Sequence, residues 1–247
     1  MKKIKNNFND AAYRYLEYSN IQKFFAAKIV DFIKELNPQK KGEWIDLGSG
    51  PGLLADKIEN EFSSQKVCRI DFSKEMLSKN KLSSQKILWD LNNDLPSEIN
   101  NCSLITSNFC IHWLNNPEKL IKNWLGKLMP GGFLILSYPT KDSFPEWKET
   151  CRKTNIEYSG LSFLYSKELL KDFKPNELYY SEKFNYLEIF DDVYKLFRSL
   201  KNVGAQSTKS KRKTVKELKE IQKFWPKNYN NKVNLSWEID IQIIKKL

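Results

Sequence analysis

The sequence predicts an α/β fold with a mostly parallel, seven-stranded sheet, helices on both faces and a helical cap. Three observations favour this class. Short apolar runs alternate with amphipathic segments through residues 40–140, and a glycine-rich turn directly follows the first run. The 247 residues are 40 % hydrophobic and 13 % aromatic, which is enough apolar material for a core. We expect a single domain over residues 1–247.

The first half of the chain has the clearer pattern. Residues 1–40 are expected to form an N-terminal helical lid of one or two helices, because apolar side chains recur at helical spacing from Ile21 to Ile33. In the core, residues 41–140, apolar runs predict strands at 43–47, 67–71, 87–90, 103–108 and 133–138. Helices are expected at 53–62, from about 73, and at 117–128. A Pro-Gly-Gly turn at 130–132 precedes the fifth strand.

The second half is less regular. Residues 141–176 are expected to form an inserted helical cap. Residues 177–247 are expected to hold two long strands, at 177–190 and 235–244, and a basic helical segment. Helices are expected there at about 191–200 and 214–224. The chain has no Gly/Ser/Pro-rich linker, so these parts are treated as one domain.

Composition excludes several classes of protein. No apolar run approaches the roughly 20 residues that span a bilayer, and the lysines at the start precede no apolar signal region. The 4 cysteines are scattered without a CxxC pair. We therefore expect a cytoplasmic protein with reduced thiols and without a thiolate metal site. His112 is the single histidine of the chain, so a Ser-His-Asp triad would depend on this residue alone.

The net charge of +11 is concentrated near the end of the chain, where residues 201–247 hold 12 basic and 4 acidic side chains. A local positive field of this kind favours an acidic partner, such as nucleic acid, an anionic membrane face or an acidic carrier protein. An ordinary solvated, lysine-rich surface is the alternative.

The glycine-rich turn, Gly48-Ser-Gly-Pro-Gly52, indicates close approach of backbone to a ligand. A dinucleotide fingerprint would need glycine or alanine where Leu53 stands, and no Lys-Ser/Thr pair follows to make a phosphate loop. Asp71 and Asp90 end the second and third strands. The Asp71 carboxylate can accept both hydrogen bonds of a ribose diol, and the Asp90 carboxylate can accept one from an adenine amine. We expect an adenosine-binding pocket.

At this point the sequence resembles the class I S-adenosylmethionine-dependent methyltransferases, whose fold is Rossmann-like. The resemblance rests on residues 43–52 (EWIDLGSGPG), 71–77 (DFSKEML), 89–90 (WD), 108 (N) and 128–133 (LMPGGF). It implies S-adenosyl-L-methionine as cofactor and S-adenosyl-L-homocysteine as product. The cofactor-binding residues that it implies are Asp46, Gly48, Gly50, Asp71, Met76, Asp90, Leu91 and Asn108. Gly48 and Gly50 would line the methionine portion, Asp71 the ribose, Asp90 and Leu91 the adenine, and Asn108 the sulfonium region.

The flanks are similar to the malonyl-acyl-carrier-protein O-methyltransferases of biotin biosynthesis. The similar segments are 8–22 (FNDAAYRYLEYSNIQ), 107–113 (SNFCIHW), 197–205 (FRSLKNVGA), 225–226 (WP) and 235–238 (LSWE). The resemblance implies methylation of the free carboxylate of a malonyl thioester, the entry step to pimeloyl formation. His112 stands where that family usually has Gln. A methyltransferase for another small acid, such as aconitate, and one for RNA stay open as alternatives, although no nucleic-acid or membrane partner is expected.

Candidate substrate residues follow from this chemistry. A carboxylate with a pKa near about 4 is ionised at pH 7 and needs no general base. A cation should select it, with Arg198 as first candidate and Lys201 as reserve. Tyr15 and Tyr18, three residues apart, are expected to share a helical face over the cofactor, and Trp113 to wall the acyl pocket. The lysines and arginine expected to attract an acidic acyl carrier protein are Lys209, Lys211, Arg212, Lys213, Lys216 and Lys219.

Overall fold

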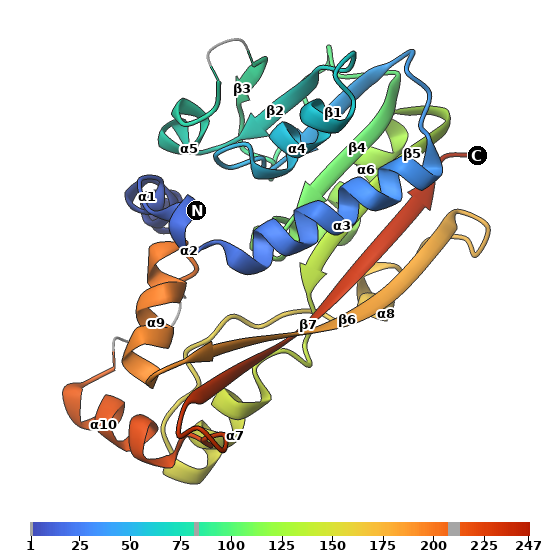
Figure 1. The fold of residues 1–247 in the computed structure, drawn as a ribbon. Helices are drawn as coiled ribbons and strands as arrows, with labels where there is room; N and C mark the ends of the chain where they lie inside the picture. The colour runs from blue at the N-terminus through green and yellow to red at the C-terminus, as the bar shows by residue number, and fades with distance from the viewer. Residues whose placement is uncertain (1, 82–83, 207–212) are drawn as a thin grey trace.

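The computed structural model describes residues 2–81, 84–206 and 213–247. A seven-stranded sheet in the order β3-β2-β1-β4-β5-β7-β6 runs through the molecule (Figure 1). The strands are β1 (Glu43–Leu47), β2 (Val67–Asp71), β3 (Lys86–Leu88), β4 (Cys102–Asn108), β5 (Leu128–Pro139), β6 (Leu178–Phe190) and β7 (Val233–Lys245). Strands β1 to β5 are parallel, and β7 is antiparallel to both β5 and β6. The predicted fold class is confirmed.

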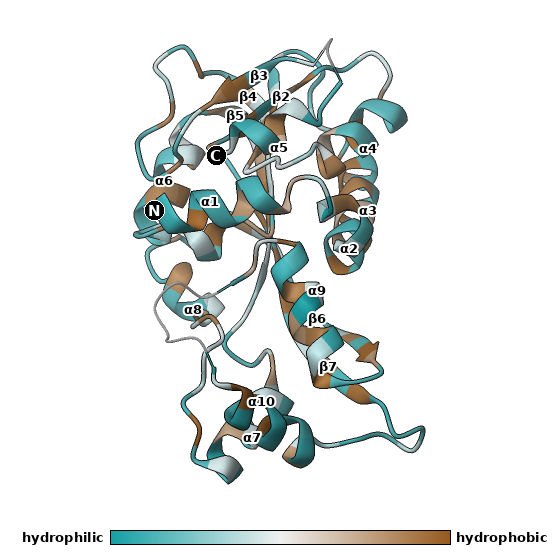
Figure 2. Cartoon of the chain, turned by 90° about the vertical axis from the view of Figure 1, so that its left-hand side faces the viewer, coloured by the Kyte–Doolittle hydropathy of each residue, from teal (hydrophilic) through white to brown (hydrophobic). Residues whose placement is uncertain are grey.

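Helices cover both faces of this sheet (Figure 2). They are α1 (Lys2–Ala11), α2 (Tyr15–Tyr18), α3 (Asn20–Leu36), α4 (Leu53–Glu61), α5 (Lys74–Ser78), the 3-10 turn η1 (Ile111–Trp113), α6 (Pro117–Gly126), α7 (Pro145–Thr154), α8 (Ser166–Leu169), α9 (Val193–Asn202) and α10 (Val215–Phe224). Buried side chains of α3 and α4 join one core cluster, and those of α6 and α8 join the other. Within the described ranges, no helix is long and apolar enough to cross a membrane.

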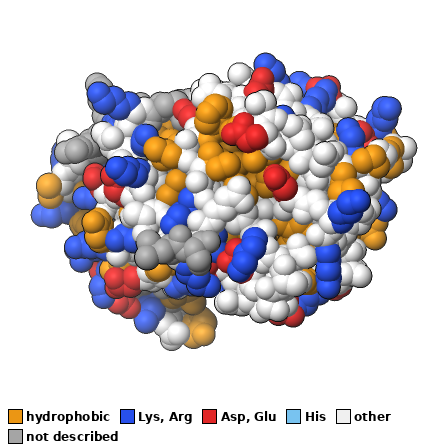
Figure 3. Space-filling view, turned by 90° about the horizontal axis from the view of Figure 1, so that it is seen from above, with side chains coloured by type: hydrophobic (Ala, Val, Ile, Leu, Met, Phe, Trp, Pro, Cys, Tyr) orange, Lys and Arg blue, Asp and Glu red, His pale blue; other side chains and the backbone are white. Residues whose placement is uncertain are grey.

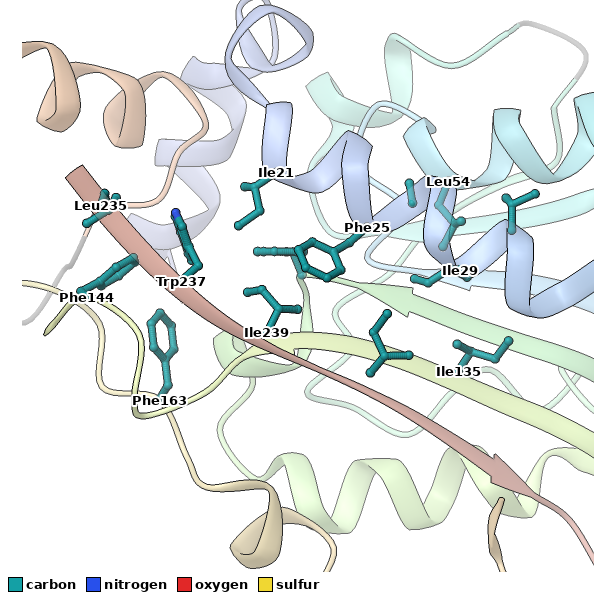
Figure 4. Packing of buried hydrophobic residues seen from close by; sticks show 14 of the residues in the cluster. Ile21, Phe25, Ile29, Leu54, Ile135, Phe144, Phe163, Leu235, Trp237 and Ile239 are labelled. Carbon is teal, nitrogen blue, oxygen red and sulfur yellow. The ribbon is translucent and has the colours of Figure 1, made fainter. Parts of the chain in front are cut away.

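Helix α3 supplies the largest apolar face. Ile21, Phe25, Ile29 and Ile33 recur every four residues and are all buried, as expected for the inward side of an amphipathic helix. Figure 4 shows the first three of these side chains pointing toward β5 and β7. Each such side chain contributes roughly 1.5–3 kcal/mol through burial. The start of α3 lies beside the carboxyl end of β4, where the Asn108 amide donates to the carbonyl of Gln22.

Several element ends differ from the predicted ones by one or two residues, and three larger differences stand out. The N-terminal segment forms three helices, not one or two. Strand β3 ends at Leu88, so Asp90 lies in the loop beyond it. The Pro-Gly-Gly segment at 130–132 is the start of β5, because the β4–β5 register shifts between Cys102 and Leu104 and absorbs the irregular backbone.

A cap lobe is built on the far half of β7. Strand pairing with β5 stops at Ile239. Residues 233–238 pair with β6, apart from one isolated bridge between Val233 and Lys227, and extend below the sheet (Figure 1). Helices α7 and α10 pack there around buried Trp147, Ile221 and Trp225. The segment expected to be a helical cap, 141–176, is helical only at α7 and α8. The lobe faces the edge of the sheet where the parallel strands end.

Candidate active site

The glycine turn after β1 is held against the end of β2. The backbone N–H groups of Gly48 and Ser49 both donate to the carbonyl of Ile70, at 2.8 and 3.1 Å. Gly48 has φ +69°, and a Cβ there would lie 2.3 Å from the Cys110 sulfur. Only glycine combines this left-handed backbone with so close a neighbour. The turn therefore presents bare backbone to the adjoining cavity.

Asp71 joins the end of β2 to this turn. One carboxylate oxygen accepts from the N–H of Gly50 at 2.9 Å, and the other accepts from the N–H of Ser73 at 2.8 Å. Burial raises the pKa of Asp71 to about 6, and these hydrogen bonds oppose the rise. Since a carboxylate has about four acceptor sites, each oxygen keeps capacity for a ligand hydroxyl.

A narrow cavity of about 60 Å³ lies at the ends of β1, β2 and β4. It brings together most of the predicted cofactor residues and two of the predicted substrate residues: Tyr15, Gly48, Gly50, Asp71, Met76, Asp90, Leu91, Asn108 and Trp113. Asp46 is the exception. Its carboxyl is buried behind the turn, accepts from the Thr106 hydroxyl at 3.2 Å and does not line the cavity. Asp46 therefore supports the turn from behind, and burial raises its pKa to about 7.

Asn108 is fixed in its place on the cavity wall. Its amide nitrogen donates to the carbonyl of Gln22 at 3.0 Å, and its amide oxygen accepts from the Ser137 hydroxyl at 2.6 Å. These bonds tie the end of β4 to α3 on one side and to β5 on the other. The amide is thus oriented before any ligand binds.

A second cavity, of about 530 Å³, adjoins the first. The two share Phe8, Tyr15, Phe109 and Trp113. The ring of Phe8 packs edge-on to Trp113 at 5.2 Å and to Phe72 at 5.9 Å between centroids. Aromatic side chains of the cap lobe and its neighbours form much of the remaining wall: Phe144, Trp147, Phe163, Phe197 and Trp237. The arrangement provides a ligand-sized apolar chamber beside the pocket of the glycine turn.

Lys201 lines this second cavity, whereas Arg198 does not. Phe197, Leu200 and Lys201 share one face of α9, and Arg198 is turned by about 100° from Phe197. Arg198 instead lies with Tyr18 in a separate surface groove. The expectation that Arg198 faces the substrate is therefore not supported by its position, and the reserve candidate, Lys201, is the better placed cation.

Tyr15 and Tyr18 do not share a site either. Tyr15 lines both cavities, and Tyr18 lines the groove that holds Arg198. Helix α2 is a single turn, in which side chains three residues apart already diverge by about 60°. Of the two tyrosines, Tyr15 lines the narrow cavity, beside Phe8 of α1, and Tyr18 does not.

His112 forms part of the wall of the second cavity. Its ring packs against Trp113 and Phe163, at 5.3 and 5.4 Å between centroids. Burial lowers the pKa of His112 to about 3, so the ring is neutral at pH 7. Across the part of the chain that the structure describes, no cluster of three or more His, Cys, Asp or Glu side chains is placed to hold a metal ion.

Several residues that line the two cavities have no assigned role in the sequence analysis, among them Phe8, Phe109 and Cys110. Phe8 stood in the quoted opening motif without a role, and the pattern alone gives no signal for its position between two cavities. Cys110 lines the narrow cavity and lies close to Gly48. Its position two residues after β4 was a usable signal, because α/β ligands bind beyond the ends of parallel strands.

The basic segment is described in part. Lys209, Lys211 and Arg212 lie outside the described residues. Lys213 lines the second cavity, and Lys216 and Lys219 are exposed on α10. On the face seen in Figure 3, Lys and Arg side chains are spread over the outline with acidic side chains among them. Of these three lysines, Lys213, which precedes α10, is the one that lines the cavity.

Comparison with known proteins identifies the class. Residues 19–182 match a family model described as a methyltransferase domain. Because this is more than half of the chain, the protein belongs to that family, and it is a methyltransferase. Its fold is similar to that of two solved structures. The YcgJ protein of Bacillus subtilis has a TM-score of 0.60 and 17 % identity, with coverage of 87 % of this chain and 96 % of that chain. A putative methyltransferase from Bacillus halodurans has a TM-score of 0.57 and 16 % identity, with coverage of 90 % of this chain and 98 % of that chain.

Curated relatives give the closer resemblance. The chain is 27 % identical to malonyl-[acyl-carrier protein] O-methyltransferase 2 of Ilyobacter polytropus, over 92 % of this chain and 90 % of the relative. It is 29 % identical to the malonyl-[acyl-carrier protein] O-methyltransferase of Buchnera aphidicola, over 93 % and 92 %. The resemblance to this group noted in the flanking motifs is confirmed, as is the expectation of an enzyme.

Proposed function

We propose that the protein transfers a methyl group from S-adenosyl-L-methionine to the free carboxylate of a malonyl thioester, the step that opens pimeloyl formation in biotin biosynthesis. The observation that carries the proposal is the junction of the two cavities. Four shared side chains separate the pocket of the glycine turn from an apolar chamber that Lys201 lines. The names of the relatives from Ilyobacter and Buchnera support the same substrate.

The residues of the smaller cavity fit the cofactor. Gly48 and Gly50 leave backbone bare for its methionine portion, and the remaining acceptor sites of Asp71 suit the ribose diol. We assign Asp90 and Leu91 to the adenine, Met76 to the apolar wall and Asn108 to the sulfonium end. Bound S-adenosyl-L-methionine supplies an activated methyl group on a positively charged sulfur, and S-adenosyl-L-homocysteine is the product.

The protein's part in the reaction is alignment and exclusion of water. The substrate carboxylate is ionised at pH 7, so the neutral His112 is not needed as a base. A carboxylate oxygen of the substrate would be the nucleophile, and the bound cofactor would supply the methyl group that it accepts. Tyr15, Phe109 and Trp113 at the junction hold water away and fix the approach, and such alignment contributes roughly 7–11 kcal/mol to lowering a barrier.

Lys201 supplies the cation that favours an ionised acyl end. We propose Lys201→Met and Arg198→Met as a matched pair on α9. Loss of an exposed ion pair of about 1 kcal/mol should raise KM for the malonyl substrate about fivefold in the Lys201 variant, with kcat and S-adenosyl-L-homocysteine affinity unchanged. The Arg198 variant should match the wild type. The reverse result would return the substrate role to Arg198.

The function itself is tested by intact-protein mass spectrometry. Malonyl-acyl carrier protein, acetyl-acyl carrier protein, malonyl-CoA and aconitate are each incubated with the enzyme and S-adenosyl-L-methionine. A gain of one methyl group on the malonyl carrier but not on the acetyl carrier supports carboxylate methylation. Methylation of aconitate alone would move the assignment to a free small acid, and no gain on any of them would reject the proposed substrate class.

A further inference from the structure

Beneath the glycine turn lies a buried polar network. We propose that Asn80, held by Arg69, is a positioning residue that sets the orientation of the Gly50 peptide for cofactor binding. The proposal rests on the proposed function only in that the turn binds the cofactor. It does not depend on which acid is methylated.

Arg69 is an unusual residue for its place. It lies in the middle of β2 and is 0 % exposed, in a parallel strand whose other residues are also buried. One guanidinium nitrogen forms ion pairs with Asp56 at 2.7 Å and Glu59 at 2.8 Å, both on α4. The other terminal nitrogen donates to the amide oxygen of Asn80 at 2.8 Å. Because a buried guanidinium is costly to desolvate, a contribution to the stability of the fold does not by itself explain why an arginine stands at position 69.

Asn80 connects Arg69 to the glycine turn through hydrogen bonds. It is 5 % exposed, and its amide nitrogen donates to the carbonyl of Gly50 at 3.0 Å and to that of Met76 at 3.2 Å. The N–H of Gly50 donates to Asp71 at 2.9 Å. The Gly50 residue is thus held at its N–H by the proposed ribose acid and at its carbonyl by Asn80. Gly50, Met76 and Asp71 all line the cofactor cavity.

The turn is packed tightly against this pair. A Cβ at Gly52, where φ is +90°, would lie 2.2 Å from the amide oxygen of Asn80 and 2.7 Å from a guanidinium nitrogen of Arg69. An apolar side chain at position 80 would fill the space but leave the Gly50 carbonyl without its Asn80 donor. The network therefore determines where the turn points, and not only how well the interior is filled.

The test is Asn80→Asp, which keeps the size and the oxygen that faces Arg69 but replaces the donor to Gly50 with an acceptor. Asn202→Asp is the matched control, since Asn202 is similarly buried, at 7 % exposed, and lines neither cavity. We expect the Asn80 variant to bind S-adenosyl-L-homocysteine about tenfold more weakly by calorimetry, with KM for the malonyl substrate unchanged. The control should stay within about twofold of the wild type.

Melting temperatures of both variants establish that the comparison is made on folded protein. Asn80→Ser, which removes the amide without adding a charge, is measured in parallel and judged by the same criterion. An affinity within twofold of wild type in a folded Asn80 variant, or equal losses in the Asn80 and Asn202 variants, would overturn the positioning role. Wild-type protein that binds S-adenosyl-L-homocysteine but does not methylate the malonyl carrier would reject the substrate alone. Wild-type protein that does not bind S-adenosyl-L-homocysteine would reject both proposals.

Discussion

The carboxylate of Asp71 accepts a hydrogen bond from the backbone N–H of Gly50 at 2.9 Å, although 21 residues separate them in the chain. This bond joins the ends of two neighbouring parallel strands, β1 and β2, through one side chain. The acid proposed to hold the ribose is thereby oriented by the same turn that is proposed to receive the methionine portion. Neither half of the site is placed independently of the other.

Protonation of Asp71 should weaken cofactor binding. Burial raises its pKa to about 6, and the protonated carboxyl has lost acceptor capacity that a ribose diol needs. The rise in melting temperature caused by saturating S-adenosyl-L-homocysteine should therefore be larger at pH 7.5 than at pH 5. In Asp71→Asn the rise should be small at both values. An equal rise at both pH values in the wild type would contradict this role for Asp71.

The stability of the ligand-free protein should depend on pH in the opposite direction. The folded-state pKa of Asp71, about 6, and that of Asp46, about 7, lie above their ordinary value. Between pH 4 and 7 the folded state then holds more protons at these carboxyls than the unfolded state, so their contribution to the free energy of unfolding falls as pH rises. Urea denaturation at pH 4.5 and 7.5 should show a larger fall for the wild type than for Asp71→Asn.

Gly48 and Cys110 should be coupled. Gly48→Ala places a methyl group 2.3 Å from the Cys110 sulfur and adds strain at φ +69°, so the turn must shift. We expect a roughly tenfold or larger loss of S-adenosyl-L-homocysteine affinity. Cys110→Gly in the same chain removes both clashing atoms and should restore part of that loss. Strictly additive effects in this double-mutant cycle would show that the contact is not what limits binding.

The sequence predicted the parts of this site that depend on chain direction. A carboxyl at the end of a parallel strand must reach the edge where the neighbouring strands end, and the structure brings Asp71 and the glycine turn together at this edge. The sequence did not predict which way the side chains of short helices point. Arg198 and Lys201 are three residues apart on α9, and the fold of the cap lobe decides which of them faces the cavity.

The network around Arg69 was overlooked for a related reason. The apolar neighbours of Arg69 predict a strand, but they do not indicate which residues would partner its charge. A charged residue inside a buried parallel strand requires partners, but its partners come from α4 and from the residue two positions after α5. Pattern alone did not bring these three segments together.

Two adjacent phenylalanines on α3 should differ sharply in their effect on stability. Phe25 is 0 % exposed and packs against Phe109 and Phe184, whereas Phe24 is 44 % exposed. Phe25→Ala should lower the free energy of unfolding by about 3–5 kcal/mol, because it leaves a cavity in the core. Phe24→Ala should cost less than about 1 kcal/mol. Urea denaturation measures both, and similar losses would mean that α3 is packed differently from Figure 4.

The lysines of α10 should matter for a carrier protein but not for a free thioester. Lys216 and Lys219 are exposed on the helix that follows Lys213, a residue of the second cavity. Changing both to Glu should reduce kcat/KM for malonyl-acyl carrier protein by about tenfold at low salt and less at high salt, because attraction to an acidic partner speeds encounter. Malonyl-CoA turnover should change much less.

The control is Lys41→Glu with Lys66→Glu, which makes the same charge change just before β1 and β2, at the opposite edge of the sheet. If both pairs reduced carrier turnover equally, total charge rather than docking at α10 would explain the effect. If malonyl-CoA turnover fell as far as carrier turnover, these lysines would act on the reaction itself.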